Sequence, residues 1–175
     1  MNAVPAYSTQ NELLLNNLMD FYKNETYLTK MLKIITGDSK ISLRIVDWFA
    51  TNYAKKHYTL YNITDSFGQQ RRFKVYFDYK LKLKAYSKKR FDPFCRWDRI
   101  SIPYINDTCI ETTIGQLNFF KWAFNNKVII YALNNQKIIY ENMSKNTYKK
   151  NIKKKKNLLI PRQDIIMTKC YVSFD

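Results

Sequence analysis

The chain has 175 residues, with 30 Lys or Arg against 14 Asp or Glu and a formal net charge of +16. This length fits one domain, and the 46% of hydrophobic residues can supply a core. Three glycines and four prolines exclude a collagen-like or loop-rich chain, and no glycine-rich loop of the kind that cradles nucleotide phosphates is present in the sequence.

The N-terminal part of the chain is predicted to be largely helical. Residues 1–9 are expected to form an arm. From Gln10 to Ile35 the apolar residues recur every three to four positions, which predicts one long or two short amphipathic helices. Gly37 follows, and a glycine in this place is typical of a helix end. We therefore take residues 1–40 as an arm and a helical region.

The next two segments have the clearest patterns. Ser42 is a suitable N-cap for a helix over residues 42–56, whose apolar residues line one face. In residues 72–86 apolar positions alternate with positions that are mostly Lys, which predicts a long strand with one face in the core and the other in solvent. The segment 59–63 is the expected antiparallel partner of this strand.

Two more short strands are expected at residues 99–105 and 109–113. A helix over residues 114–126 begins with a T-x-x-Q capping box formed by Thr113 and Gln116, in which each side chain satisfies an unpaired amide of the first turn. These elements lead us to predict an α+β fold in which helices pack on one face of an antiparallel sheet.

The C-terminal part is harder to assign. The segment "VIIYAL" fits either a short buried strand or more helix, and the lysine run 145–156 is expected to be exposed and mobile. The tail is expected to return as a final strand. The predicted organisation after residue 40 is a core over 41–141 built around the strand 72–86, a basic exposed segment over 142–157, and a returning segment over 158–175.

Positive charge is concentrated in two segments. Residues 71–99 hold eleven Lys or Arg and three Asp, whereas residues 142–157 hold seven Lys and no acidic residue. Their net charges, +8 and +7, sum to +15 of the total of +16. Clustered positive charge is typical of proteins that bind a polyanion, either nucleic acid or an acidic membrane surface.

The predicted strand gives the first cluster a specific use. Lysines two residues apart on one face of a strand are separated by about 6.6–6.8 Å, which is near the phosphate spacing of a nucleic-acid strand. Aromatic side chains beside them could stack on unpaired bases. The predicted nucleic-acid-binding residues are Lys74, Lys80, Lys82, Lys84, Lys88, Lys89, Arg90, Arg96, Arg99, Tyr76, Trp97, Lys153, Lys154, Lys155 and Lys156.

Other interpretations of the same lysines stay open. A row of lysines is also typical of a solvated strand face that is protected against edge-to-edge pairing. The C-terminal lysine run fits a nuclear localisation signal, a non-specific tether to a polyanion, or a linker.

Enzymatic chemistry has less support in the sequence. Arginines near Cys95 would favour its thiolate form, but the single histidine, His57, would have to reach it. Asp92 and Asp98 could form a carboxylate pair, although ion pairs with neighbouring arginines or turn caps explain them more simply. The cysteines and the histidine have no zinc-like spacing. We therefore expect no enzyme activity, no metal site and no cofactor.

The sequence also indicates a compartment. Three widely spaced cysteines without a C-x-x-C motif fit a reducing environment better than a disulfide framework. The first residues lack the pattern of a secretory signal, and no apolar run approaches the ~20 residues of a membrane span. We expect an intracellular protein with no transmembrane segment.

Four blocks, "SLRIVDWFATNYAKK", "KLKAYSKKRFDPFCRWDRI", "TTIGQLNFFKWAFNN" and "VSFD", resemble a family of small basic proteins from nucleocytoplasmic large DNA viruses of the iridovirus-like and mimivirus-like kinds. The resemblance covers residues 41–175. In the commoner form within this family, the second block contains "FDPFCRR". Trp97 therefore replaces an arginine, which indicates that the charge at this position is dispensable. The resemblance brings no activity and no catalytic residue. It implies a viral protein of the host cytoplasm, where it would lie in the viral factory, or of the virion, and the basic runs also allow the nucleus.

Together these observations favour a non-enzymatic viral protein that binds nucleic acid through a basic strand face and a lysine-rich tail. The alternative is a virion structural or scaffold protein whose basic faces meet acidic protein or membrane surfaces. An enzyme that uses Cys95 or the pair Asp92 and Asp98 is the third hypothesis. The sequence does not distinguish DNA from RNA and does not give the oligomeric state.

Overall fold

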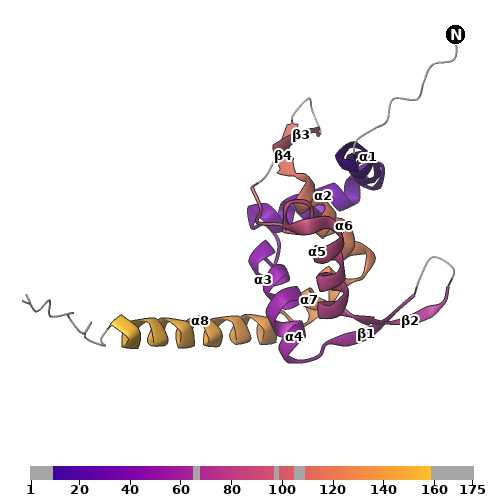
Figure 1. Ribbon diagram of the computed structural model, residues 1–175. Helices are drawn as coiled ribbons and strands as arrows, with labels where there is room; N and C mark the ends of the chain where they lie inside the picture. Colours follow the sequence, from indigo (N-terminus) through magenta and orange to yellow (C-terminus); the bar gives the residue numbers. More distant parts are fainter. Residues whose placement is uncertain (1–9, 65–67, 97–98, 105–108, 159–175) are drawn as a thin grey trace, which may run out of the picture. The chain divides into compact units, whose positions relative to one another are not determined.

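The computed structural model of the protein describes residues 10–64, 68–96, 99–104 and 109–158, with side chains described as far as Tyr148 (Figure 1). The predicted N-terminal arm and the predicted return of the tail beyond Leu158 lie outside the described residues.

The described residues form helices and short antiparallel strands, so the predicted α+β class is confirmed (Figure 1). In chain order the elements are α1 (Gln10–Tyr22), α2 (Glu25–Thr36), α3 (Leu43–Trp48), the π-helical turn η1 (Phe49–Tyr53), α4 (Ala54–Lys56), β1 (Leu60–Thr64), β2 (Gln70–Lys74), α5 (Val75–Phe91), β3 (Arg99–Pro103), β4 (Cys109–Thr113), α6 (Ile114–Asn125), α7 (Val128–Asn134) and α8 (Gln136–Leu158).

Local capping signals explain why several elements begin and end where the sequence predicts. Ser42 caps α3, and its hydroxyl accepts from the Ile45 amide at 3.4 Å. Gly37 ends α2 with a φ of 91°, a left-handed conformation that glycine adopts without strain. The helical region before it is two helices, because Lys23 and Asn24 interrupt the pattern and Asn24 caps α2.

The N-cap of α6 is also as predicted, with one change. The Thr113 hydroxyl accepts from the Gln116 amide at 3.1 Å. The Gln116 side chain, however, accepts from the Thr112 hydroxyl at 2.8 Å instead of reaching back to the amide of Thr113. The segment "VIIYAL" forms α7, which settles its open assignment as helix.

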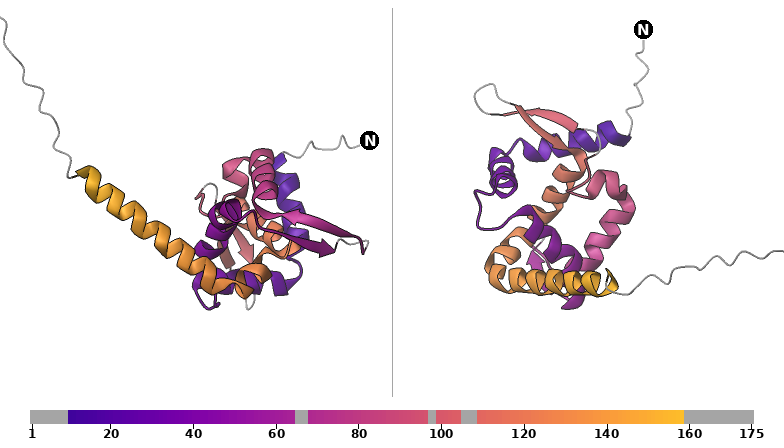
Figure 2. Two further views of the ribbon diagram at one scale, coloured as in Figure 1. Left: turned by 90° about the horizontal axis from the view of Figure 1, so that it is seen from below. Right: turned by 90° about the vertical axis from the view of Figure 1, so that its left-hand side faces the viewer.

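The strands form two separate hairpins. β1 pairs with β2 in the register Leu60 to Lys74, and β3 pairs with β4 in the register Arg99 to Thr113. The β1–β2 hairpin projects away from the helices (Figure 2). Segment 59–63 therefore meets the partner we predicted, but only over the first residues of that partner.

The prediction of a long strand over residues 72–86 is wrong, because strand β2 ends at Lys74 and helix α5 begins at Val75. The apolar residues of this segment fit both periods. Val75 and Tyr79 are buried, and Leu83 and Tyr86 are partly buried, which is a helical stripe. Lysine, leucine and alanine are also strong helix formers. The two helices expected to cover a sheet here pack instead on α5.

Helix α6 forms the centre of the core. Its buried residues are Gly115, Leu117, Asn118, Phe119, Phe120, Trp122 and Ala123. The rings of Phe119 and Trp122 lie 6.0 and 5.7 Å from that of Phe91, and Tyr79 joins the same cluster at 5.6 Å from Phe91. Each buried aromatic side chain contributes about 1.5–3 kcal/mol to folding by leaving water.

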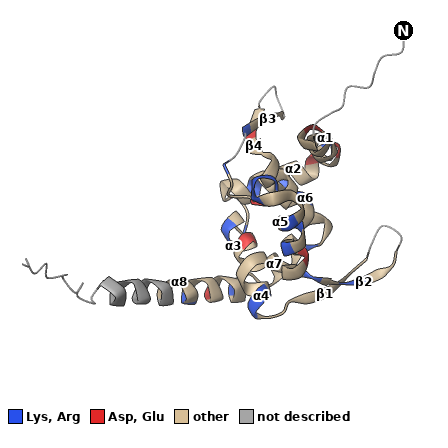
Figure 3. Ribbon diagram, viewed as in Figure 1, with Lys and Arg blue, Asp and Glu red and all other residues tan. Residues whose placement is uncertain are grey.

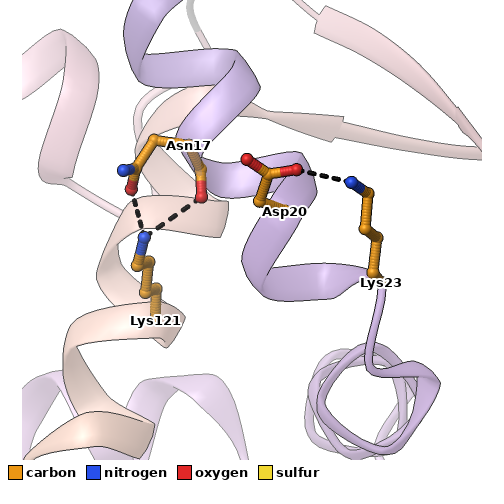
Figure 4. Close-up of polar contacts among 4 residues, drawn as sticks. All are labelled: Asn17, Asp20, Lys23 and Lys121. Atoms are coloured by element: carbon orange, nitrogen blue, oxygen red, sulfur yellow. Dashed lines mark hydrogen bonds and ion pairs between the residues drawn. The ribbon is translucent and has the colours of Figure 1, made fainter.

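Polar contacts tie the N-terminal helices to α6. The Tyr22 hydroxyl donates to the Leu117 carbonyl at 2.8 Å, and burial raises the pKa of this tyrosine far above its usual value. The Lys121 ammonium donates to the carbonyl and the side-chain oxygen of Asn17 in α1, while Asp20 pairs with Lys23 at 2.7 Å (Figure 4). Burial lowers the pKa of Lys121. This lysine therefore has a structural role in joining two helices.

The C-terminal end of α5 fits closely against the start of α6. A Cβ on Gly115 would lie 2.9 Å from the carbonyl oxygens of both Lys89 and Asp92, so the backbones meet where only glycine fits. The Asn118 amide donates to the Arg90 carbonyl at 2.9 Å. Within α5, Ser87 interrupts the helix with φ 66° and ψ 165°.

The chain divides into two compact units, Met1–Met143 and Ser144–Asp175. Helix α8 contributes to both, and its residue Ile139 is fully buried in the first unit. The lysine run that we expected to be mobile is helical through Leu158. Lys153, Lys154, Lys155 and Lys156 lie on this helix, and their side chains are outside the described part.

Candidate nucleic-acid interface

The turn from α4 into β1 holds an aromatic ring in solvent. Tyr58 has a φ of 47°, in the left-handed region that residues with a side chain rarely adopt. The next residue, Thr59, makes two backbone hydrogen bonds. Its amide donates to the Ala54 carbonyl at 3.1 Å, and its carbonyl accepts from the Val75 amide at 3.2 Å. These bonds fix the turn against the start of α5, and the Tyr58 side chain is 77% exposed.

A pocket of about 400 Å³ lies beside this turn. Its size falls within the range of about 300–1,000 Å³ that is usual for ligand pockets. Four elements supply its walls: α4, the turn, the β1–β2 hairpin and the first turn of α5. The lining residues are Ala54, Lys55, Tyr58, Thr59, Leu60, Lys74, Tyr76 and Phe77.

Lysines from three elements lie over the rings of this pocket. The ammonium of Lys55 is 5.6 Å from the centre of the Tyr76 ring, and that of Lys80 is 5.9 Å from it. Lys74 lies 5.9 Å from the centre of the Phe77 ring. These distances are within cation–π range. Figure 3 marks the Lys and Arg residues along α4, β2 and α5 from which this charge comes.

The pocket also has an unsatisfied polar atom in its wall. The Thr59 hydroxyl is buried, with the residue 7% exposed, and it has no hydrogen-bond partner among the described residues. Such a group costs about 1–3 kcal/mol in the free protein. A ligand with a hydrogen-bonding edge could recover part of this cost after the side chain rotates.

A second hollow, of about 510 Å³, lies along α5. Phe77 lines both hollows, and the second one adds Lys80, Leu81, Leu83 and Lys84. Phe77 and Leu81 are 58% and 65% exposed, although the predicted strand placed both in the core. The two hollows are therefore neighbours on either side of Phe77, and we call the surface formed by their lining residues the aromatic track.

The structure places part of the predicted binding set on this track. Lys74, Lys80, Lys84 and Tyr76 lie on it. Lys82 is partly buried and points elsewhere, because residues two apart on a helix lie on nearly opposite sides. Asp78, expected in solvent beside them, accepts from the Trp122 indole at 2.6 Å. The prediction that four lysines form a row on one face of a strand is therefore wrong.

The remaining predicted residues lie near the end of α5 and beyond it. Lys88 pairs with Asp92 at 3.6 Å, and Arg90 contacts Gln10 at 3.4 Å. Lys89 is exposed in the last turn. Asp92 also accepts from the Phe94 amide at 2.8 Å, so it caps a turn as we proposed from the sequence. Trp97 and Asp98 lie outside the described residues.

Cys95 lies in a separate hollow of about 260 Å³ with Arg96 and Arg99. Arg99 pairs with Glu111 across the β3–β4 hairpin at 3.2 Å. Among the described residues that line this hollow none is a histidine. His57 instead stacks on Tyr53, with ring centres 4.2 Å apart. The structure therefore does not bring together the Cys–His pair that nucleophilic chemistry at Cys95 would need.

Sequence reasoning missed three residues of the aromatic track. Lys55 lies at the end of the helix predicted over residues 42–56, Phe77 lies on the core face of the predicted strand, and Tyr58 falls between the predicted elements. The signal for Phe77 was present, because the helical stripe over Val75 and Tyr79 leaves position 77 outside. The exposure of Tyr58 depends on a turn conformation that has no local sequence signature.

These features define a basic α+β protein with an exposed aromatic pocket edged by lysines. The chain belongs to a family of unknown function, DUF7197, whose model matches residues 2–168. The match takes in α1 and α2, so it reaches further toward the N-terminus than the resemblance over residues 41–175 described above.

One relative is a protein of Acanthamoeba polyphaga mimivirus, named "Uncharacterized protein L507". It is 46% identical over 151 residues, which cover 83% of this chain and 58% of the relative, so the chain spans little more than half of the relative's length. The resemblance to an uncharacterised family of large DNA viruses is thereby confirmed. No solved structure matches the chain. In the part of the chain that the structure describes, no helix has both the length and the apolar character of a membrane span.

Proposed function

We propose that this protein binds nucleic acid through the aromatic track and the lysines along its edges. The observation that supports the proposal most directly is the placement of Lys55, Lys74 and Lys80 over two aromatic rings that border an open pocket. Cations that gather around exposed rings suit a ligand that presents both phosphates and flat bases.

The distribution of charge supports the same proposal. The net charge is +16, and most of it lies in the segments that form β2, α5 and α8. A surface with this excess of positive charge attracts polyanions and speeds their association. Since the relative is a viral protein, we propose that this binding takes place either in the cytoplasm of an infected host cell or in the virion.

A salt-titrated binding assay tests the proposal. The full chain is titrated against labelled single-stranded DNA, single-stranded RNA and duplex DNA, and fluorescence anisotropy reports the affinity between about 50 and 200 mM salt. Each phosphate that a lysine neutralises adds about 0.7 to 0.9 to the slope of log affinity against log salt concentration. We expect steep slopes, because counterions are released on binding.

Matched charge variants assign the binding to the aromatic track. Changing Lys55, Lys74 and Lys80 together to Gln should lower the slope for a single strand by about 2. The control changes Lys23, Lys30 and Lys33 of the α1–α2 region to Gln, which removes the same charge at another place. An equal loss in both variants would show that only net charge matters, and no binding at low salt would refute the proposal. Binding to acidic viral proteins without any to nucleic acid would favour a scaffold role.

A further inference from the structure

The rings of the aromatic track differ from ordinary core aromatics in their exposure. Tyr58 is 77% exposed and Phe77 is 58% exposed, and both line the same pocket. Tyr58 is held there by a left-handed backbone, which costs about 1–3 kcal/mol for a residue other than glycine. The free protein thus keeps two aromatic rings in water, and the backbone is strained at one of them, Tyr58.

The shape of the pocket restricts what could cover these rings. It is a concave space of about 400 Å³ with aromatic walls, large enough for one flat ring system. In a duplex the faces of the bases are stacked on one another and are not available to protein rings. In a single strand each base has a free face, and base–aromatic stacking is the usual way in which proteins hold it.

Charge restricts the ligand further. Lys55 and Lys74 line the pocket, and the Lys80 ammonium lies 5.9 Å from the centre of its Tyr76 ring, so a flat ring in the pocket would have cations close by. A nucleotide has this arrangement, with a flat base attached through a sugar to a phosphate. The buried Thr59 hydroxyl, which has no partner in the described part of the chain, adds a polar group to the pocket wall. This is an independent feature that suits the hydrogen-bonding edge of a base.

The second hollow supports an extended ligand. It shares Phe77 with the first and leads along α5 past Leu81 to Lys84. A chain of nucleotides that leaves the pocket over Phe77 would therefore meet another apolar surface with lysines beside it.

We propose that the pocket formed by Tyr58, Tyr76 and Phe77 receives an unpaired base of single-stranded nucleic acid. Lys55, Lys74 and Lys80 contact the phosphates on either side of that base. This inference rests on the nucleic-acid-binding function proposed above, and it specifies the class of ligand and the way in which the ligand is read.

An abasic strand separates the contribution of the bases from that of the phosphates. The full chain is titrated with an oligothymidylate and with an oligomer of abasic sites that has the same number of phosphates. One stacked base contributes about 1–3 kcal/mol, which corresponds to an affinity ratio of about 5- to 150-fold in favour of the strand with bases. Both strands should show similar salt slopes, because both offer the same charge.

Variants of the pocket test whether the preference arises there. Tyr58→Leu and Phe77→Leu keep an apolar side chain but remove the stacking ring, and each should lower the affinity ratio by about 5-fold or more. Tyr140→Leu is the matched control, since Tyr140 is 55% exposed on α8 and does not line the pocket. Its ratio should equal that of the wild type. Circular dichroism and urea titration check that the variants are folded.

The outcomes distinguish the inference from the function on which it rests. Equal, salt-dependent affinity for both strands would overturn the base-binding pocket and leave the nucleic-acid-binding function standing. A base preference that persists in both pocket variants would likewise overturn the inference. No binding to any strand would refute the function itself. Binding to vesicles of phosphatidylserine that is lost in Phe77→Leu, without a preference for bases, would assign the track to a membrane surface instead.

Discussion

The contact between α5 and α6 leads to a prediction about Gly115. In Gly115→Ala the added methyl would lie 2.9 Å from the carbonyl oxygens of Lys89 and Asp92 and 3.4 Å from the amide nitrogen of Phe91. All three neighbours are backbone atoms, so no side chain can rotate away. Alanine would gain about 0.5–1 kcal/mol as the better helix former, whereas overpacking of this kind costs about 1–3 kcal/mol. We expect a net loss of about 1–2 kcal/mol in the free energy of unfolding.

Urea titration followed by circular dichroism measures this loss. Asn16→Ala is the control, because Asn16 is exposed in α1, where the same new residue should be neutral or slightly stabilising. Gly115→Ala is therefore expected to lower the urea midpoint with an unchanged slope, whereas Asn16→Ala should leave the midpoint unchanged or raise it slightly. If Gly115→Ala were as stable as the wild type, the close approach of the two backbones would not exist as described.

Three further changes have defined expectations. Burial and the nearby carboxylate of Asp92 raise the pKa of Asp47 from 3.8 to about 6. The Asp47 carboxyl thus binds its proton more tightly in the folded state than in the unfolded chain. Lowering the pH through about 6 toward 3.8 should therefore raise the free energy of unfolding of the wild type, by at most about 3 kcal/mol more than that of Asp47→Asn. Urea titrations of both proteins at about pH 7 and about pH 4.5 measure this difference, and parallel pH dependence would contradict it. Thr59→Val removes a buried hydroxyl that has no partner among the residues the structure describes, and it should raise the free energy of unfolding by about 1 kcal/mol while weakening single-strand binding. A clear destabilisation would show that the hydroxyl has a partner. Ser87→Gly should stabilise the protein by about 1–2 kcal/mol in the same assay, because Ser87 has φ 66° and ψ 165°, a conformation that essentially only glycine adopts; a less stable variant would mean that α5 is not interrupted there.

Elements fixed by local interactions were predictable from the sequence. Ser42 and Thr113 cap their helices through bonds to amides three residues away, and Gly37 ends a helix through its own backbone freedom. Such interactions lie within one turn of the chain, so a residue pattern is sufficient to indicate them. The two hairpins were also indicated, because each joins neighbouring segments.

The segment over residues 72–86 shows where this reasoning fails. Its apolar residues alternate, but Val75, Tyr79 and Leu83 also fall on one side of a helix, and the sequence alone does not decide between the two periods. The decision comes from packing, since the helix buries Val75 and Tyr79 in the core and brings the Tyr79 ring to 5.8 Å from that of Trp122.

The candidate site was predictable in composition but not in geometry. Lysine and aromatic residues in this region indicated a polyanion surface. The convergence of Lys55 and Lys80 on the Tyr76 ring requires that α4 and α5 pack together, and this contact joins parts of the chain that local patterns treat separately. The residues just before Cys95 contact the start of α6 through their backbone, which no local pattern indicates.

Ser87 interrupts α5, and the parts of the helix before and after it make different contacts. Lys80 and Lys84 precede it and lie on the aromatic track, whereas Lys89 and Arg90 follow it, and their backbone carbonyls meet α6. Charge reversal at the exposed Lys80 and Lys84 should therefore impair the proposed ligand binding in a molecule that still folds. Changes in the backbone contacts after Ser87 should destabilise the fold and leave these two lysines unchanged. The exposed lysines of the aromatic track thus lie before Ser87 and the close backbone contact with α6 lies after it, while Val75 and Tyr79 before Ser87 also belong to the core.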